Sequence, residues 1–188
     1  MALYNEEALE KCVELLRNCF ANGGKLLVCG NGGSSADSAH IVGELVKGFL
    51  KKRPLPAELC EAIGTDKLQQ GLPAIDLTAH SALISAVAND LGGDYCYAQQ
   101  VVAYGRPGDV LIGISTSGNA KNVALAMKTA GALGLGRIAL TGARGGAIRE
   151  LCEIWAPAES DETYLIQEEH LRFYHQLCAR VEAEFFTE

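Results

Sequence analysis

Two residues near the start of the chain, His40 and Glu44, have types and a spacing that could support chemistry. They are four positions apart in a stretch expected to be helical, so both side chains project from one helix face, about one turn apart. An imidazole and a carboxylate placed in this way can share a metal ion or move protons. The alternative is an ordinary solvated helix face, which produces the same pattern by accident.

A second set of candidate ligands follows near the other end of the chain, at Gln167, His170 and His175. Gln167 and His175 are eight residues apart, which is roughly 12 Å along a helix at about 1.5 Å per residue. Both can therefore meet one ion only if their side chains reach towards each other, or if one of them comes from a neighbouring subunit. We interpret His170 as a helix-surface residue.

A glycine-rich loop follows the apolar run at residues 25–30 and leads directly into a helix. Its candidate ligand-binding residues are Asn31, Gly32, Gly33 and Ser34. Glycines free the backbone N–H groups, serines add hydroxyl donors, and the helix N-terminus contributes its positive dipole end. The loop predicts an anion cradle, with a plain tight turn as the alternative. It matches neither G-x-G-x-x-G nor G-x-x-x-x-G-K-[ST], so a dinucleotide or triphosphate site is not indicated.

A second loop with the same chemistry follows the apolar run at residues 109–114 and again enters a helix. It supplies Ser115, Thr116, Ser117 and Asn119 as candidate donors. A phosphate needs several short donors without bulk, and this loop has them without any Lys or Arg. Hydroxyls that merely cap the helix are the alternative.

The elements that must position these groups alternate along the chain. Apolar runs typical of buried parallel strands occur at residues 25–30, 73–77, 109–115 and 136–142, with a weaker fifth at 153–157. Helical periodicity covers residues 5–20, 36–49, 81–90, 95–104, 121–133, 147–152 and 162–185. This order predicts a three-layer α/β sandwich with a central five-stranded parallel sheet and ligands beyond the carboxyl ends of its strands.

Length and composition predict one domain over residues 1–188, with a first helix within residues 1–22 and a long polar surface excursion at residues 50–72. The net charge of -7 argues against binding to nucleic acid or to an anionic membrane by bulk electrostatics. Seven singly placed cysteines indicate reduced thiols. No export signal and no membrane-spanning stretch is recognised, so we expect a cytoplasmic protein.

The strings GNGGSSADSAHIVGEL, GISTSGN and LTG, with QEEHLRFYHQLCARVE near the end, resemble the sugar isomerase (SIS) domain family. Residues 31–44 and 167–175 resemble its phosphoheptose isomerase branch in particular. The resemblance extends over nearly the whole chain. It implies a flavodoxin-like fold, a homotetramer with active sites between subunits, and interconversion of sedoheptulose 7-phosphate and a heptose phosphate aldose.

The same resemblance implies roles for individual residues. It assigns a zinc ion to His40, Glu44, Gln167 and His175, and makes Glu44 the base and His175 the acid. Asn31, Ser34, Asn89 and Asp90 match positions lining the sugar pocket, while Ser115, Thr116 and Ser117 match the phosphate loop. Three features depart from the family: Ala120 stands where a serine donor is usual, Tyr164 where an aspartate is usual, and the excursion at residues 50–72 is longer.

The leading hypothesis is therefore a zinc-assisted isomerase of a phosphorylated ketose. Its rival is a non-catalytic SIS protein that binds a phosphosugar and acts through a protein partner, like the replication-initiation regulators that resemble this enzyme. Such proteins lack the full acid/base set, which this chain has at Glu44 and His175. The first helix is expected either to pack on the sheet or to mediate self-association.

Overall fold

A computed structural model describes residues 5–186 and shows a parallel sheet of five strands. The strands are β1 (Leu26–Gly30), β2 (Ala74–Asp76), β3 (Val110–Ser115), β4 (Gly136–Thr141) and β5 (Ile154–Pro157), in the order β2-β1-β3-β4-β5. This is the flavodoxin-like order, so the predicted fold class is confirmed. The strand order reverses between β1 and β3, where Leu26 is in register with Val110 and Gly30 with Ile114.

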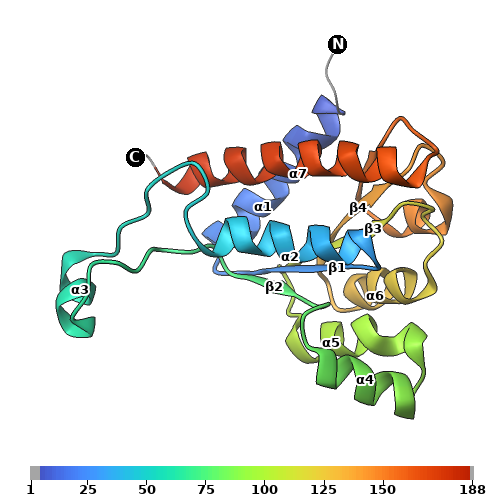
Figure 1. The fold of residues 1–188 in the computed structure, drawn as a ribbon, viewed down its shortest axis with the longest axis horizontal. Coiled ribbons are helices and arrows are strands. Elements are labelled where there is room, and N and C mark those ends of the chain that lie inside the picture. Colours follow the sequence, from blue (N-terminus) through green and yellow to red (C-terminus); the bar gives the residue numbers. More distant parts are fainter. Residues whose placement is uncertain (1–4, 187–188) are drawn as a thin grey trace.

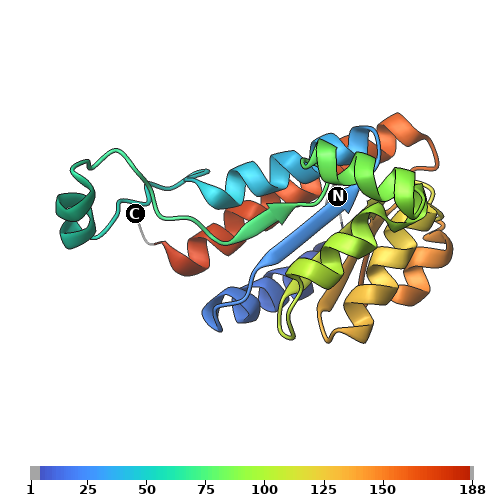
Figure 2. The ribbon, with the colours of Figure 1, turned by 90° about the horizontal axis from the view of Figure 1, so that it is seen from below.

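Helices cover both faces of the sheet because successive strand residues alternate between two apolar cores. One core joins α1 (Glu6–Ala21), α2 (Gly33–Val46) and α7 (Thr163–Phe185) to strand residues such as Val28, Ile112 and Leu140. The other joins α5 (Cys96–Tyr104), α6 (Lys121–Ala132) and η2 (Gly146–Leu151) to the opposite strand positions. Figures 1 and 2 show the resulting three layers. The first helix therefore packs on the sheet, which was one of its two predicted roles.

The boundaries differ from the sequence prediction in two informative places. Helix α2 begins at Gly33, three residues earlier than expected, because Gly32 takes a positive φ of 58° and turns the chain directly into the helix. The segment predicted as a helix at residues 147–152 is a 3-10 helix, η2. The remaining elements, α4 (Ser81–Asp90) and the short η1 (Gly93–Tyr95), precede α5.

Residues 50–72 form an arm that extends away from the sheet and carries α3 (Ala57–Ile63) (Figures 1 and 2). None of the α3 residues is buried. The base of the arm is held firmly by an ion pair of Arg53 with Glu182 of α7, at 2.9 Å and with both side chains fully buried. Glu182 also accepts hydrogen bonds from the amides of Phe49, Leu50 and Lys51. These bonds hold the pKa of Glu182 below its usual range, although its burial acts in the opposite direction.

All seven cysteines are free thiols, and five of them are buried. None of the helices between residues 5 and 186 has the length and hydrophobicity needed to cross a bilayer.

Candidate active site

The two predicted loops lie side by side at the point where the strand order reverses. The first follows β1 and the second follows β3, and these strands are neighbours in the sheet. Asn31 of the first loop and Asn122 at the start of α6 exchange two hydrogen bonds of 2.9 Å each. The Tyr97 hydroxyl, from α5, donates to the carbonyl of Gly30 at 2.6 Å and lies 3.1 Å from Asn31 Oδ1. In doubly wound sheets this is the usual position of a ligand.

In the β1–α2 loop, several of the groups predicted to bind an anion are used within the fold itself. The amides of Ser34 and Ser35 already bond to Asn31 and Gly32 carbonyls at 3.0 Å, and the Ser34 side chain is buried. Gly33 has a packing reason to be glycine, since a Cβ there would lie 2.2 Å from Nε2 of Gln167. The loop is thus closed against α7 by the side chain of Gln167.

The β3–α6 loop (residues 115–119) forms the floor of a cavity of about 290 Å³. Ser117 Oγ accepts from the Asn119 amide at 3.2 Å, which leaves its own hydrogen available to a ligand. The side chain of Asn119 is engaged within the fold, because its Oδ1 accepts from the Ala147 amide at 3.0 Å. Ala120, the N-cap of α6, makes no side-chain capping bond. The loop therefore offers hydroxyls and amides, and the side chain of Ala120 adds no donor.

Three of the predicted chemical groups form a cluster between α2 and α7. His40 Nε2 lies 3.1 Å from Glu44 Oε1 and 3.4 Å from Nε2 of His175. We call these residues the acid/base cluster. The rings of the two histidines pack edge to face at a centroid distance of 4.9 Å. Partial burial and the nearby His40 lower the pKa of His175, although Glu44 acts in the opposite direction.

A polar chain behind His40 fixes the orientation of its ring. His40 Nδ1 lies 3.0 Å from the Tyr174 hydroxyl, which in turn donates to Asp37 Oδ1 at 3.2 Å. With that proton given to Asp37, the hydroxyl accepts from Nδ1–H, and Nε2 presents its lone pair to the cluster. Burial raises the pKa of Asp37 and of Tyr174.

Glu44 is positioned from its backbone side as well. The guanidinium of Arg53 donates to the carbonyl of Leu45 at 2.6 Å and to that of Glu44 at 3.2 Å. These carbonyls belong to the last turn of α2, where they have no partner within the helix. The base of the arm thereby holds the end of α2 that carries Glu44.

Gln167 and His170 differ from the acid/base cluster in their surroundings. Gln167 packs against Gly33, whereas His175 contacts His40, and no hydrogen bond described between residues 5 and 186 joins Gln167 to the other three predicted ligands. The interpretation of His170 as a surface residue is wrong. It is 2% exposed and its Nε2 bonds to the carbonyl of Thr141 at 3.1 Å, because this side of α7 packs against the ends of β4 and β5.

The remaining predicted sugar-pocket residues lie on the surface. Asn89 and Asp90 are exposed on the last turn of α4, where the Asn89 amide donates to Asp90 Oδ1 at 2.7 Å. Tyr164 is exposed on the first turn of α7. No bond described between residues 5 and 186 joins Asn89 or Asp90 to the two loops or to the acid/base cluster.

Sequence reasoning missed several residues that shape the site, namely Tyr97, Asn122, Arg53, Tyr174 and Arg144. Two of them carried a local signal. Tyr174 precedes His175, and Asn122 follows the β3–α6 loop by three residues. Arg53, Tyr97 and Arg144 become visible only when the tertiary contacts are known.

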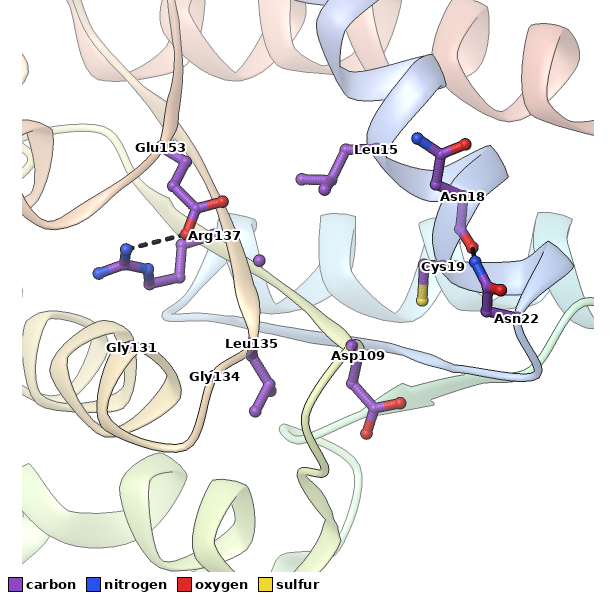
Figure 3. Close-up of a pocket in the computed structure, with 12 residues that line it drawn as sticks. Leu15, Asn18, Cys19, Asn22, Asp109, Gly131, Gly134, Leu135, Arg137 and Glu153 are labelled. Atoms are coloured by element: carbon purple, nitrogen blue, oxygen red, sulfur yellow. Dashed lines mark hydrogen bonds and ion pairs between the residues drawn. The ribbon is translucent and has the colours of Figure 1, made fainter.

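A separate cavity of about 470 Å³ lies at the opposite edge of the sheet, beside α1 and the amino ends of β3 and β4. Figure 3 shows Arg137 paired with Glu153 on one side, and Asn18 and Asn22 of α1 on the other. None of the predicted site residues lines this cavity. The two candidate loops lie at the carboxyl edge of the sheet, and the acid/base cluster lies between α2 and α7.

The donor chemistry of the acid/base cluster fits a metal ion in part. Ligand atoms around a tetrahedral zinc with bonds of about 2.1 Å lie about 3.4 Å apart, close to the two separations from His40. Three electron-pair donors facing one another also need a proton or a cation between them. However, no three His, Cys, Asp or Glu side chains of residues 5–186 form a complete metal-binding group.

Comparison with known proteins identifies the family of the chain. The SIS domain family matches residues 2–142. The chain belongs to the SIS domain family. The phosphoheptose isomerase of Geotalea daltonii is 42% identical over 94% of this chain and 83% of its own length. That of Synechocystis is 40% identical over 96% of this chain and 85% of its own length.

Solved structures place the chain in the same branch. The phosphoheptose isomerase from Francisella tularensis superimposes with a TM-score of 0.83 at 34% identity, covering 97% of this chain and 87% of its own. That from Neisseria gonorrhoeae gives 0.81 at 35% identity, covering 95% and 86%. The resemblance to the phosphoheptose isomerase branch is therefore confirmed, and the chain is an enzyme of the isomerase class.

Proposed function

We propose that this SIS protein interconverts sedoheptulose 7-phosphate and D-glycero-D-manno-heptose 7-phosphate with the help of zinc. The observation that carries the proposal is the contact of His40 with both Glu44 and His175, and the β3–α6 loop adds donors for a phosphate. The names of the relatives support the heptose phosphate as substrate. The non-catalytic alternative gains no support from them.

In the proposed reaction, the Glu44 carboxylate takes a proton from the carbon beside the ketose carbonyl. His175 gives a proton to the carbonyl oxygen, which yields an enediol. Glu44 returns its proton to the former carbonyl carbon, and His175 recovers one from the new aldehyde oxygen. Because its pKa is lowered, His175 enters as the neutral imidazole at pH 7, with one N–H to donate.

His40, Glu44 and His175 would hold the zinc, with Gln167 as a further ligand. When bound, zinc acts as a Lewis acid towards a carbonyl oxygen. Since Gln167 of the same chain packs on Gly33, its place at the cluster is open to a second copy. This is consistent with the proposed homotetramer, whose active sites lie between subunits.

The proposal is tested by incubating the zinc-loaded protein with sedoheptulose 7-phosphate and following aldose formation. No turnover of this sugar, or of other ketose phosphates, would overturn it. Glu44→Gln should lower kcat by about 10²- to 10⁴-fold, because the amide cannot take the proton. Glu58→Gln removes an equal charge from exposed α3 and should leave kcat unchanged.

A further inference from the structure

The cavity above the β3–α6 loop is lined by a cationic side chain that the loop sequence did not predict. Its lining residues are Thr116, Ser117, Asn119, Gly142, Arg144, Asp161 and Ile166. Arg144 is the single cationic residue among them, and it comes from the segment that follows β4. It lies 25 residues beyond Asn119 in the chain, so no motif links it to the loop.

Backbone contacts fix Arg144 over the loop. Gly118 has a φ of 65°, and a Cβ there would lie 1.9 Å from the carbonyl oxygen of Gly145, the residue after Arg144. The amide of Ile148 donates to the Gly118 carbonyl at 3.0 Å, and the Gly142 amide donates to the Thr116 carbonyl at 2.9 Å. Residues 142–148 thus rest directly on the β3–α6 loop, on both sides of Arg144.

The guanidinium has a partner that it can exchange. Arg144 Nη2 lies 2.9 Å from Asp161 Oδ2, with side chains that are 83% and 53% exposed. Ion pairs this exposed contribute little to stability, because both groups stay hydrated. A phosphate dianion offers two oxygens to the planar guanidinium and forms a stronger, charge-assisted pair. Both residues line the cavity, so this exchange needs only a side-chain rotation.

We propose that Arg144 binds the substrate phosphate, leaving Asp161 when a sugar phosphate enters the cavity. The inference rests on the proposed function, which supplies the phosphate. The bound phosphate would lie between the Ser117 hydroxyl below and the guanidinium above. Arg144 thereby compensates for Ala120, which provides no donor at the start of α6. Asp161 acts as a positioning residue that keeps the guanidinium over the cavity and competes with the ligand.

Calorimetric titration with inorganic phosphate tests this without requiring turnover. Arg144→Gln should weaken phosphate binding by about tenfold or more, since a charged hydrogen bond is lost. Arg144→Lys keeps the positive charge but not the planar guanidinium with its two parallel donors, so its phosphate affinity should fall less. Asp161→Asn should strengthen binding a few-fold by releasing Arg144, an effect opposite in sign that a purely structural role would not give.

Arg106→Gln is the matched control, because it removes the same charge near the amino end of β3 and should leave phosphate binding unchanged. Equal affinity in the wild type and Arg144→Gln would overturn the role of Arg144, as would an equal loss in Arg106→Gln. If Ser117→Ala weakens phosphate binding while Arg144→Gln does not, Arg144 is excluded and the proposed function stands. A wild-type protein that binds no phosphate and isomerises no ketose phosphate overturns both.

Discussion

The two halves of the candidate site are built in different ways. The β3–α6 loop is held by backbone bonds and by glycines in close contact with residues 142–148. The acid/base cluster is held by side chains of α2 and α7, which are more than 130 residues apart in the chain. Backbone geometry leaves a short local signature in the sequence, whereas side chains that meet across two helices do not. Backbone strain should therefore be what disrupts the β3–α6 loop, which we call the phosphate end of the site. The acid/base cluster, its acid/base end, should instead be disrupted by removing the side chains that hold it.

The largest expected effect comes from the support of the acid/base end. Arg53→Met leaves Glu182 as a buried carboxylate without its charged partner, and it removes the guanidinium hydrogen bonds to the carbonyls of Glu44 and Leu45. The free energy of unfolding should fall by about 3–5 kcal/mol. Urea denaturation measures this loss, and kcat should fall while the affinity for phosphate stays the same. A loss below about 1 kcal/mol would show that the Arg53–Glu182 pair does not stabilise this part of the fold.

A smaller effect is expected at the phosphate end. Gly118→Ala places a Cβ against the Gly145 carbonyl at a positive φ, so the two loops must separate. We expect a loss of about 3 kcal/mol in unfolding free energy, together with loss of phosphate binding. Gly64→Ala is the matched control: its φ is 82° but nothing lies within 4 Å, so it should cost only about 1 kcal/mol. Equal losses in the two variants would contradict the close contact.

The smallest effect concerns pH and the strand end next to the phosphate loop. Burial lowers the pKa of His170, whose Nε2 bonds to the Thr141 carbonyl at the end of β4. Below pH 6.5 His170 is protonated in the unfolded chain but stays neutral in the folded chain. The free energy of unfolding is therefore higher above that pH and falls on acidification. Between pH 7.5 and 5.5 the free energy of unfolding of the wild type should fall by about 1 kcal/mol more than that of His170→Gln. Parallel pH profiles in urea denaturation would refute this.

The sheet, its five strands and the two loops could be predicted because each depends on a short run of residues. Apolar runs that end in glycine and serine define both a buried parallel strand and the turn that follows it. The burial of His170 was missed because helix periodicity alone does not say which side of α7 faces the strand ends. The partners of Arg144 and Arg53 were missed because they depend on how separate loops pack together.

The arm at residues 50–72 shows how the chain can vary without disturbing its sheet. Its two legs are joined at the base, where the Gly48 amide bonds to Gln69 Oε1 and the Gln70 amide to the Arg53 carbonyl, both at 2.7 Å. Everything beyond these bonds, including α3, contributes no buried residue. Residues can therefore be added to or removed from the tip without a shift in strand register, since closing a longer surface loop costs little. The arm is a site where the length of the chain can evolve independently of its chemistry.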